Sequence, residues 1–160
     1  MRILNFVLLV FCGAANAQTG YVYSGDLNGD GILDTIKSGP SELFGNGGGP
    51  FVLSLSDGKG GFLLRDIGLH PEAVALDFVE GHPRLWSYWR MSCCDGSLGV
   101  TTLDASFKTE TISLNFGKGV SEPTISRNIY ESIFRPENRI VFTFVENYEP
   151  PLPLSGEWGK

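Results

Sequence analysis

Residues 24–39 read SGDLNGDGILDTIKSG, and side-chain oxygens recur within this stretch at positions 1, 3, 5 and 9 of a loop that begins at Asp26. Alternate spacing in a tight loop turns such oxygens inward, and the Ile32 carbonyl at position 7 adds another. Gly31 permits the sharp turn. Ca²⁺ takes about six to eight oxygen ligands in proteins. The spacing therefore predicts a calcium site whose ligands are Asp26, Asn28, Asp30, Ile32 and Asp34.

An Asn- and Gly-rich turn without an ion is the alternative interpretation of this loop. That alternative gives no reason for acidic residues at this spacing. A standard EF-hand is excluded, because it needs a bidentate Glu at position 12 and flanking helices. Position 12 is Lys37, and the flanking segments have the pattern of strands. A dockerin-type loop is excluded on the same grounds.

The stretch and the later segment at residues 44–62, FGNGGGPFVLSLSDGKGGF, together resemble an FG-GAP (VCBS-type) repeat, the unit of integrin-type β-propellers. The resemblance covers residues 21–62 and implies the same calcium ligands, from Asp26 to Asp34. It does not imply a complete propeller, because closure takes at least about four blades. We therefore expect a mainly β, small antiparallel domain that contains one propeller-blade-like calcium hairpin.

Residues 21–62 and 75–107 share a faint pattern of acidic start, strand, small-residue turn, strand and closing Phe. In this alignment Asp77 corresponds to Asp26, and the second unit lacks the polar loop. A second, degenerate blade-like unit is one interpretation of the pattern, and coincidence is the other.

Apolar runs predict strands at residues 51–55, 85–89 and 100–103, and glycine-rich segments predict turns between strands. Ile125, Ile129 and Ile133 fall at even spacing before a turn at residues 135–138, which predicts a β-hairpin over residues 125–145. Pro71 fits the start of a short helix over residues 71–78, a segment that equally fits an extended strand. Residues 18–149 are expected to form a single β-rich domain, followed by an extended Pro-rich tail at residues 150–160.

The N-terminal segment has the pattern of a secretory signal peptide, with Arg2, an apolar run and small residues ending at Ala17. Cleavage there leaves 143 of the 160 residues. The alternative, a lipoprotein signal with Cys12 as the lipidated residue, is disfavoured by the bulky Phe11 before it. The protein is therefore expected to be exported, to the periplasm or beyond the cell, without a membrane span.

Acidic side chains outnumber basic ones by 18 to 12, which disfavours nucleic acid as a partner. Cys93 and Cys94 are the only cysteines after residue 17, and neighbours in sequence cannot join distant parts of a fold. They are expected to form a vicinal disulfide, to pair with another chain or to remain thiols, and the vicinal ring is favoured.

The sequence offers no credible catalytic constellation. His70 and His82 are each followed by proline and are expected to cap turns rather than act as bases. Trp86 and Tyr88 alternate with Trp89, so an aromatic platform for a sugar competes with core packing. The function favoured is a non-catalytic calcium-binding module with a protein or glycan ligand. The alternatives are a periplasmic inhibitor or immunity protein that neutralises a toxin or hydrolase, and a secreted hydrolase.

Overall fold

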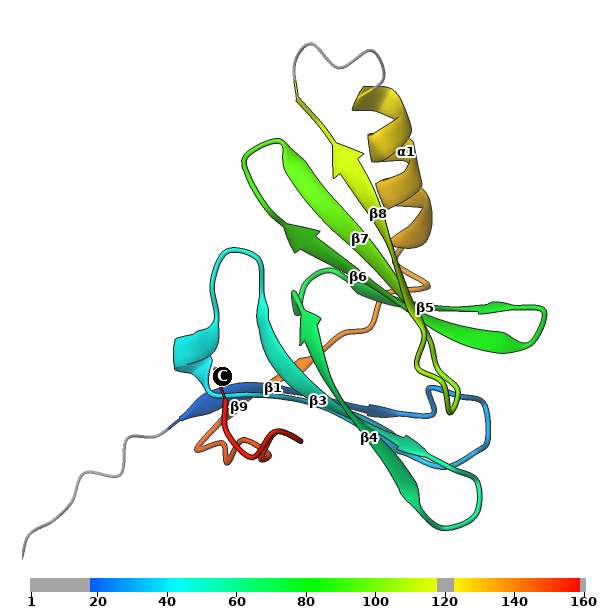
Figure 1. The fold of residues 1–160 in the computed structure, drawn as a ribbon, viewed down its shortest axis with the longest axis vertical. Helices are drawn as coiled ribbons and strands as arrows, with labels where there is room; N and C mark the ends of the chain where they lie inside the picture. Colours follow the sequence, from blue (N-terminus) through cyan, green and yellow to red (C-terminus); the bar gives the residue numbers. More distant parts are fainter. Residues whose placement is uncertain (1–17, 118–122, 159–160) are drawn as a thin grey trace, which may run out of the picture.

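Two antiparallel sheets and one helix form three layers in the computed structural model, which describes residues 18–117 and 123–158 (Figure 1). The predicted signal peptide at residues 1–17, including Cys12, lies outside the described residues. The described part is mainly β, with neither a closed barrel nor a complete propeller, as the sequence predicts.

The first sheet has the strand order β4-β3-β2-β1-β9. Its strands are β1 (Thr19–Gly25), β2 (Asp34–Ser38), β3 (Gly49–Ser56), β4 (Phe62–Leu69) and β9 (Thr143–Glu146). A short 3-10 helix, η1 (Ser41–Leu43), and a glycine turn connect β2 to β3. The predicted strand at residues 51–55 is confirmed as the centre of β3.

The second sheet has the strand order β5-β6-β7-β8. Its strands are β5 (Val74–Val79), β6 (His82–Arg90), β7 (Asp95–Thr102) and β8 (Thr109–Asn115). Glu80 and Gly81 join β5 to β6 with φ of 52° and 81°, as a two-residue type I′ hairpin turn requires. The predicted strands at residues 85–89 and 100–103 are confirmed in β6 and β7, the latter ending at Thr102.

Two apolar cores separate the three layers. The first core lies between the sheets and is centred on Leu27, Ile36, Phe51, Leu53, Leu55, Leu69, Val74, Leu85, Leu103, Phe107 and Ile140. The second core lies between the second sheet and helix α1 (Pro123–Ile133), and is centred on Ala73, Ala75, Trp86, Leu98, Leu114 and Phe134. The second sheet therefore buries both faces, in agreement with the alternation of apolar side chains along its strands.

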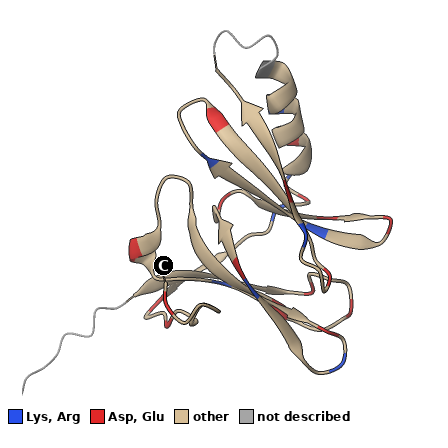
Figure 2. Cartoon of the chain, in the orientation of Figure 1, with Lys and Arg blue, Asp and Glu red and all other residues tan. Residues whose placement is uncertain are grey.

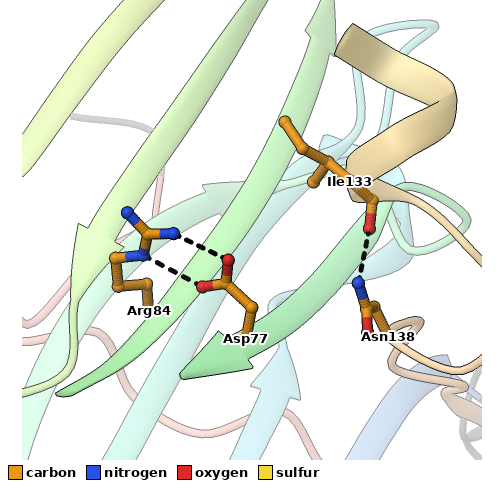
Figure 3. A network of polar contacts seen from close by, with 4 residues as sticks. All are labelled: Asp77, Arg84, Ile133 and Asn138. Carbon is orange, nitrogen blue, oxygen red and sulfur yellow. Dashed lines mark hydrogen bonds and ion pairs between the residues drawn. The ribbon is translucent and has the colours of Figure 1, made fainter. Parts of the chain in front are cut away.

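Strands β1 to β4 and strands β5 to β8 each form a four-stranded meander, but Asp77 and Asp26 occupy different places in them. Asp26 follows the end of β1, whereas Asp77 lies inside β5. Asp77 accepts hydrogen bonds from Arg84 of β6, at 3.0 Å from Nε and 2.7 Å from Nη2 (Figure 3). This pair is a cross-strand contact within the second sheet, and the origin of the two meanders as a repeat stays a prediction.

Helix α1 shows that the predicted β-hairpin over residues 125–145 is wrong. Residues four apart share one face of a helix as well as one face of a strand, and Ile129 and Ile133 use the helical spacing to reach the second core. The predicted turn after them is present, since the Asn138 amide donates to the Arg135 carbonyl at 3.0 Å. Asn138 also donates from Nδ2 to the Ile133 carbonyl at 3.3 Å, at the end of α1 (Figure 3). Strand β9 pairs with β1 instead.

The extended alternative holds at residues 71–78, where β5 begins at Val74. The Pro-rich tail contains no strand among its described residues, and it folds back on the first sheet. Its Leu154 amide donates to Asp66 of β4 at 3.0 Å. Trp158 lies beside Gly39.

None of the helices in the described part of the chain has the length and apolar character to cross a membrane.

Replacement of Phe51 by alanine is expected to lower the free energy of unfolding by about 3 to 5 kcal/mol. Phe51 is fully buried, and its ring packs on Phe44 and Phe142 at centroid distances of 5.5 and 5.3 Å. Phe62→Ala is the matched control, because that ring is 53% exposed and its loss should cost about 0.5 kcal/mol or less. Urea denaturation measures both, and equal losses would contradict the assignment of Phe51 to the core.

Candidate metal centre

The predicted calcium loop connects β1 to β2 and lies against the end of β3. Asn28 donates from Nδ2 to the Ser56 carbonyl at 2.9 Å, which fixes the loop to the last residue of that strand. Gly29 and Gly31 have φ of 80° and 82°, a conformation that glycine adopts without steric cost. The two glycines thus provide the sharp turn expected from the sequence.

The Asp26 carboxylate accepts hydrogen bonds from three backbone amides of this loop. Oδ1 accepts the amides of Gly29 at 2.7 Å and Asp30 at 3.1 Å, and Oδ2 accepts the amide of Gly31 at 2.9 Å. A carboxylate offers about four acceptor sites, so Oδ2 retains one.

Asn28 and Asp30 contact each other on the next turn of the loop. Asn28 accepts the Asp30 amide at 3.1 Å, and its Nδ2 lies 3.2 Å from Asp30 Oδ2. The pKa of Asp30 is lowered, chiefly by the Ile32 amide; burial raises it by less than that, and weaker hydrogen bonds from Ser56 and Asn28 lower it further. The Ile32 amide lies 2.8 Å from Asp30 Oδ1.

Asp34 has a different environment, because its side chain is completely buried. Oδ2 accepts the Leu27 amide and Oδ1 accepts the Ser56 amide, each at 2.7 Å. The carboxylate therefore joins the start of the loop to the end of β3. Sequence spacing alone predicts Asp34 as a ligand and does not reveal this second role.

Tyr23 of β1 lies beside the same group of carboxylates. Burial raises the pKa of its hydroxyl, and the negative charges of Asp26 and Asp34 raise it further. The hydroxyl packs over Gly25, where a Cβ atom would clash with it. Gly25 is therefore required by this tyrosine rather than by the loop.

The donor chemistry of the loop fits a hard cation, although its oxygens do not converge on one point in the observed arrangement. Among the described residues, no group of three or more His, Cys, Asp or Glu side chains has the geometry to hold a metal. Asp26, Asp30 and Asp34 each keep at least one acceptor site beyond their hydrogen bonds.

A hollow of about 440 Å³ opens beside the loop, and the sequence did not predict it. Its polar lining includes Asn28 and Asp30 of the loop, Asp57 and Lys59 of the β3–β4 turn, and Asp104 beyond β7. Asp57 accepts the amides of Lys59 and Gly61, and Asp104 accepts the hydroxyl and then the amide of Ser106; these hydrogen bonds lower the pKa of both carboxyls. Because both aspartates stabilise turns, the sequence around them has the pattern of a turn. It gives no indication of a metal site.

Cys93 and Cys94 lie in the turn between β6 and β7, with their Sγ atoms 3.1 Å apart. Both are free thiols in this structure. The hydrogen bond and the charge of Cys93 raise the pKa of Cys94. The proximity fits the predicted local pair, and the vicinal disulfide stays a prediction.

The three aromatic residues of β6 separate as the alternation of the strand predicts. Trp86 and Tyr88 pack in the second core, while Trp89 is 40% exposed. Trp89 and Trp158 line one hollow of about 560 Å³ with the glycine turn before β3. Trp158 was not predicted at this place, because a position in a Pro-rich tail gives no indication of its contacts.

Comparison of the chain with protein-family models, curated proteins and solved structures found no match.

Replacement of Asp34 by asparagine is expected to lower the free energy of unfolding by about 1 to 3 kcal/mol. An amide presents one acceptor oxygen, so either the Leu27 or the Ser56 amide would face an NH₂ group in a buried site. Chemical denaturation in the presence of a calcium chelator measures this effect apart from any bound ion.

Asp57→Asn is the matched control for that experiment. Asp57 also accepts two amides, from Lys59 and Gly61, but it does so with Oδ1 alone and is exposed to solvent. Asparagine preserves this arrangement, so its stability should stay within about 0.5 kcal/mol of the wild type. Equal stability of the two variants would contradict the bridging role of Asp34.

Mass spectrometry of the protein lacking residues 1–17 should find Cys93 and Cys94 either as two thiols or as one internal loss of two hydrogens. The two residues are adjacent, and the described part of the chain contains no other cysteine. Alkylation before proteolysis distinguishes the two forms. A disulfide-linked dimer would show that the pair is not local.

Proposed function

We propose that this chain is an exported, non-catalytic binding module in which the loop from Asp26 to Asp34 holds one structural calcium ion. The observation that carries the proposal is the arrangement of the loop around its carboxylates. Asp26 binds three loop amides, and Asp34 fixes the base of the loop to β3. Asp30 lies between them in sequence and is exposed to solvent.

Electrostatic repulsion supports a cation at this place. Three carboxylates within nine residues repel one another, and no lysine or arginine lies within that stretch. The described ion pairs are Arg84 with Asp77, inside the second sheet, and Lys108 with Glu110, at the start of β8. A divalent cation bound in the loop would offset that repulsion.

The other parts of the proposal rest on the sequence. Export rests on the N-terminal segment ending at Ala17, and the absence of catalysis rests on the lack of a nucleophile paired with a base. A protein or glycan is the proposed partner. The hollow lined by Trp89 and Trp158 is compatible with a glycan, since tryptophan side chains combine an apolar ring with an N–H donor.

Calcium is expected to raise the melting temperature of the protein by several degrees at millimolar concentration. Extracellular modules bind calcium at about 10⁻⁴ to 10⁻³ M, and a concentration ten times the Kd stabilises the folded state by about 1.4 kcal/mol. Magnesium should act more weakly, because it demands octahedral geometry and loses water reluctantly. Thermal melts with chelator, calcium or magnesium measure the three midpoints.

Asp30→Ala should abolish this calcium shift, and Asp57→Ala is its control. Both changes remove one exposed carboxylate from the same end of the first sheet, but only Asp30 belongs to the loop. Calorimetry should detect one site in the wild type and in Asp57→Ala. Identical midpoints under all three conditions would reject the structural calcium.

A further inference from the structure

A third hollow, of about 590 Å³, lies where the two sheets and helix α1 meet. The first sheet contributes Tyr21, the second contributes Tyr88 and Arg90, and α1 contributes Tyr130. The return segment at residues 139–142 forms another wall. No part of the predicted calcium loop lines this hollow.

The two tyrosines from the second sheet and α1 have hydroxyl groups without a described partner, and the hydroxyl of Tyr88 packs over Gly96 of β7. Tyr88 and Tyr130 pack edge to face, with centroids 5.1 Å apart. Both rings are half-buried, and no described residue makes a hydrogen bond with either hydroxyl. A half-buried hydroxyl without a protein partner is available to a ligand.

Two arginines at the same hollow have most of their donors unused. Arg90 donates from Nε to the Ser92 carbonyl at 3.0 Å, and Arg139 donates from Nε to the Phe134 carbonyl at 2.7 Å. These bonds orient each guanidinium, while neither side chain forms an ion pair with a described carboxylate. The terminal NH₂ groups thus remain free to bind an anion in a fork.

His70 also lines the hollow. Its Nδ1 accepts the Glu72 amide at 3.3 Å, which fits the predicted turn-capping role and leaves Nε2 without a described hydrogen bond. Glu72 is the one carboxylate among the lining residues, which also include two arginines and this histidine. The hollow is therefore rich in donors within a chain of formal net charge −6, whose acidic positions are spread over both sheets (Figure 2).

We propose that this hollow binds a phosphate or sulfate monoester, with the tetrahedral anion held by Arg90, Arg139 and the hydroxyls of Tyr88 and Tyr130. Two forked guanidinium groups and two hydroxyls can donate more hydrogen bonds than a planar carboxylate can accept, since a carboxylate has about four acceptor sites. The number of donors therefore favours a tetrahedral anion. Exposed Val141 and half-buried Phe142 line the same hollow and suit the organic part of the ester. This site is independent of the proposed calcium loop.

Phosphate, sulfate and acetate are the probes for this site, titrated at constant ionic strength with a calcium chelator present. NMR of the arginine Nε–H groups should show saturable shifts for Arg90 and Arg139 with phosphate or sulfate, and a much weaker response to acetate. Phenyl phosphate and phenyl sulfate then identify which ester binds more tightly. Arg90→Ala and Arg139→Ala should each weaken binding about tenfold, the effect of one charged hydrogen-bonding group.

Arg127→Ala is the control, since it removes the same charge from an exposed position of α1 outside the hollow. Tyr130→Phe keeps the ring that packs on Phe134 at 4.6 Å and removes only the hydroxyl, so it should fold and bind more weakly. If Arg127→Ala lost as much anion affinity as Arg90→Ala and Arg139→Ala, the binding would depend only on the overall charge of the protein, and the proposed site would be overturned. Acetate binding as tight as phosphate binding would overturn the site as well. So would a phosphate titration that does not saturate by about 10 mM, a concentration well above the expected Kd of about 1 mM.

Discussion

The buried carboxylate of Asp34 is the contact on which the first sheet and its loop depend. Its two oxygens accept amides from Leu27 and Ser56, which lie 7 and 22 residues away in sequence. A buried charge of this kind is tolerated only when hydrogen bonds replace the lost water. The amide of Leu27 is fixed by this bond while its side chain is fully buried in the first core. A hydrogen bond to the Leu27 amide and the burial of the Leu27 side chain consequently hold the base of the loop. The rest of the loop, from Asn28 to Leu33, faces solvent.

The return of the chain after α1 joins the two sheets. The Leu76 amide donates to the Asn138 carbonyl at 2.8 Å, and the Ile140 amide donates to the Val74 carbonyl at 3.0 Å. The same segment then enters the first sheet as β9, beside β1. Arg139 lies between these two bonds, which places it at the junction of the layers. The donor-rich hollow thus arises from the route of the chain, and no single sequence motif encodes it.

The strands and the loop were predictable because their signals are local. Alternating apolar residues, glycine turns and the oxygen spacing from Asp26 to Asp34 each act over fewer than about ten residues. Ile125, Ile129 and Ile133 were misassigned because a spacing of four satisfies a strand and a helix equally, and only the apolar face of the second sheet decides between them. The donor-rich hollow was missed for a related reason. Tyr21, Arg90 and Arg139 come from three distant parts of the chain, and their proximity depends on packing that the sequence pattern does not express.

A continuous series of aromatic contacts in the first core connects the predicted calcium loop with the donor-rich hollow. Tyr21, which lines the hollow, packs on Phe44, and Phe44 packs on Phe51, with centroids 5.6 and 5.5 Å apart. Phe51 in turn contacts Phe142, whose ring lies 6.2 Å from that of Tyr23 beside the loop carboxylates. Packed interiors resist continuous deformation. An ion at the proposed calcium loop would therefore stabilise the core that carries the hollow, while the donors that recognise an anion belong to the second sheet, α1 and the return segment. The two proposed sites are connected through stability and are separate in their chemistry.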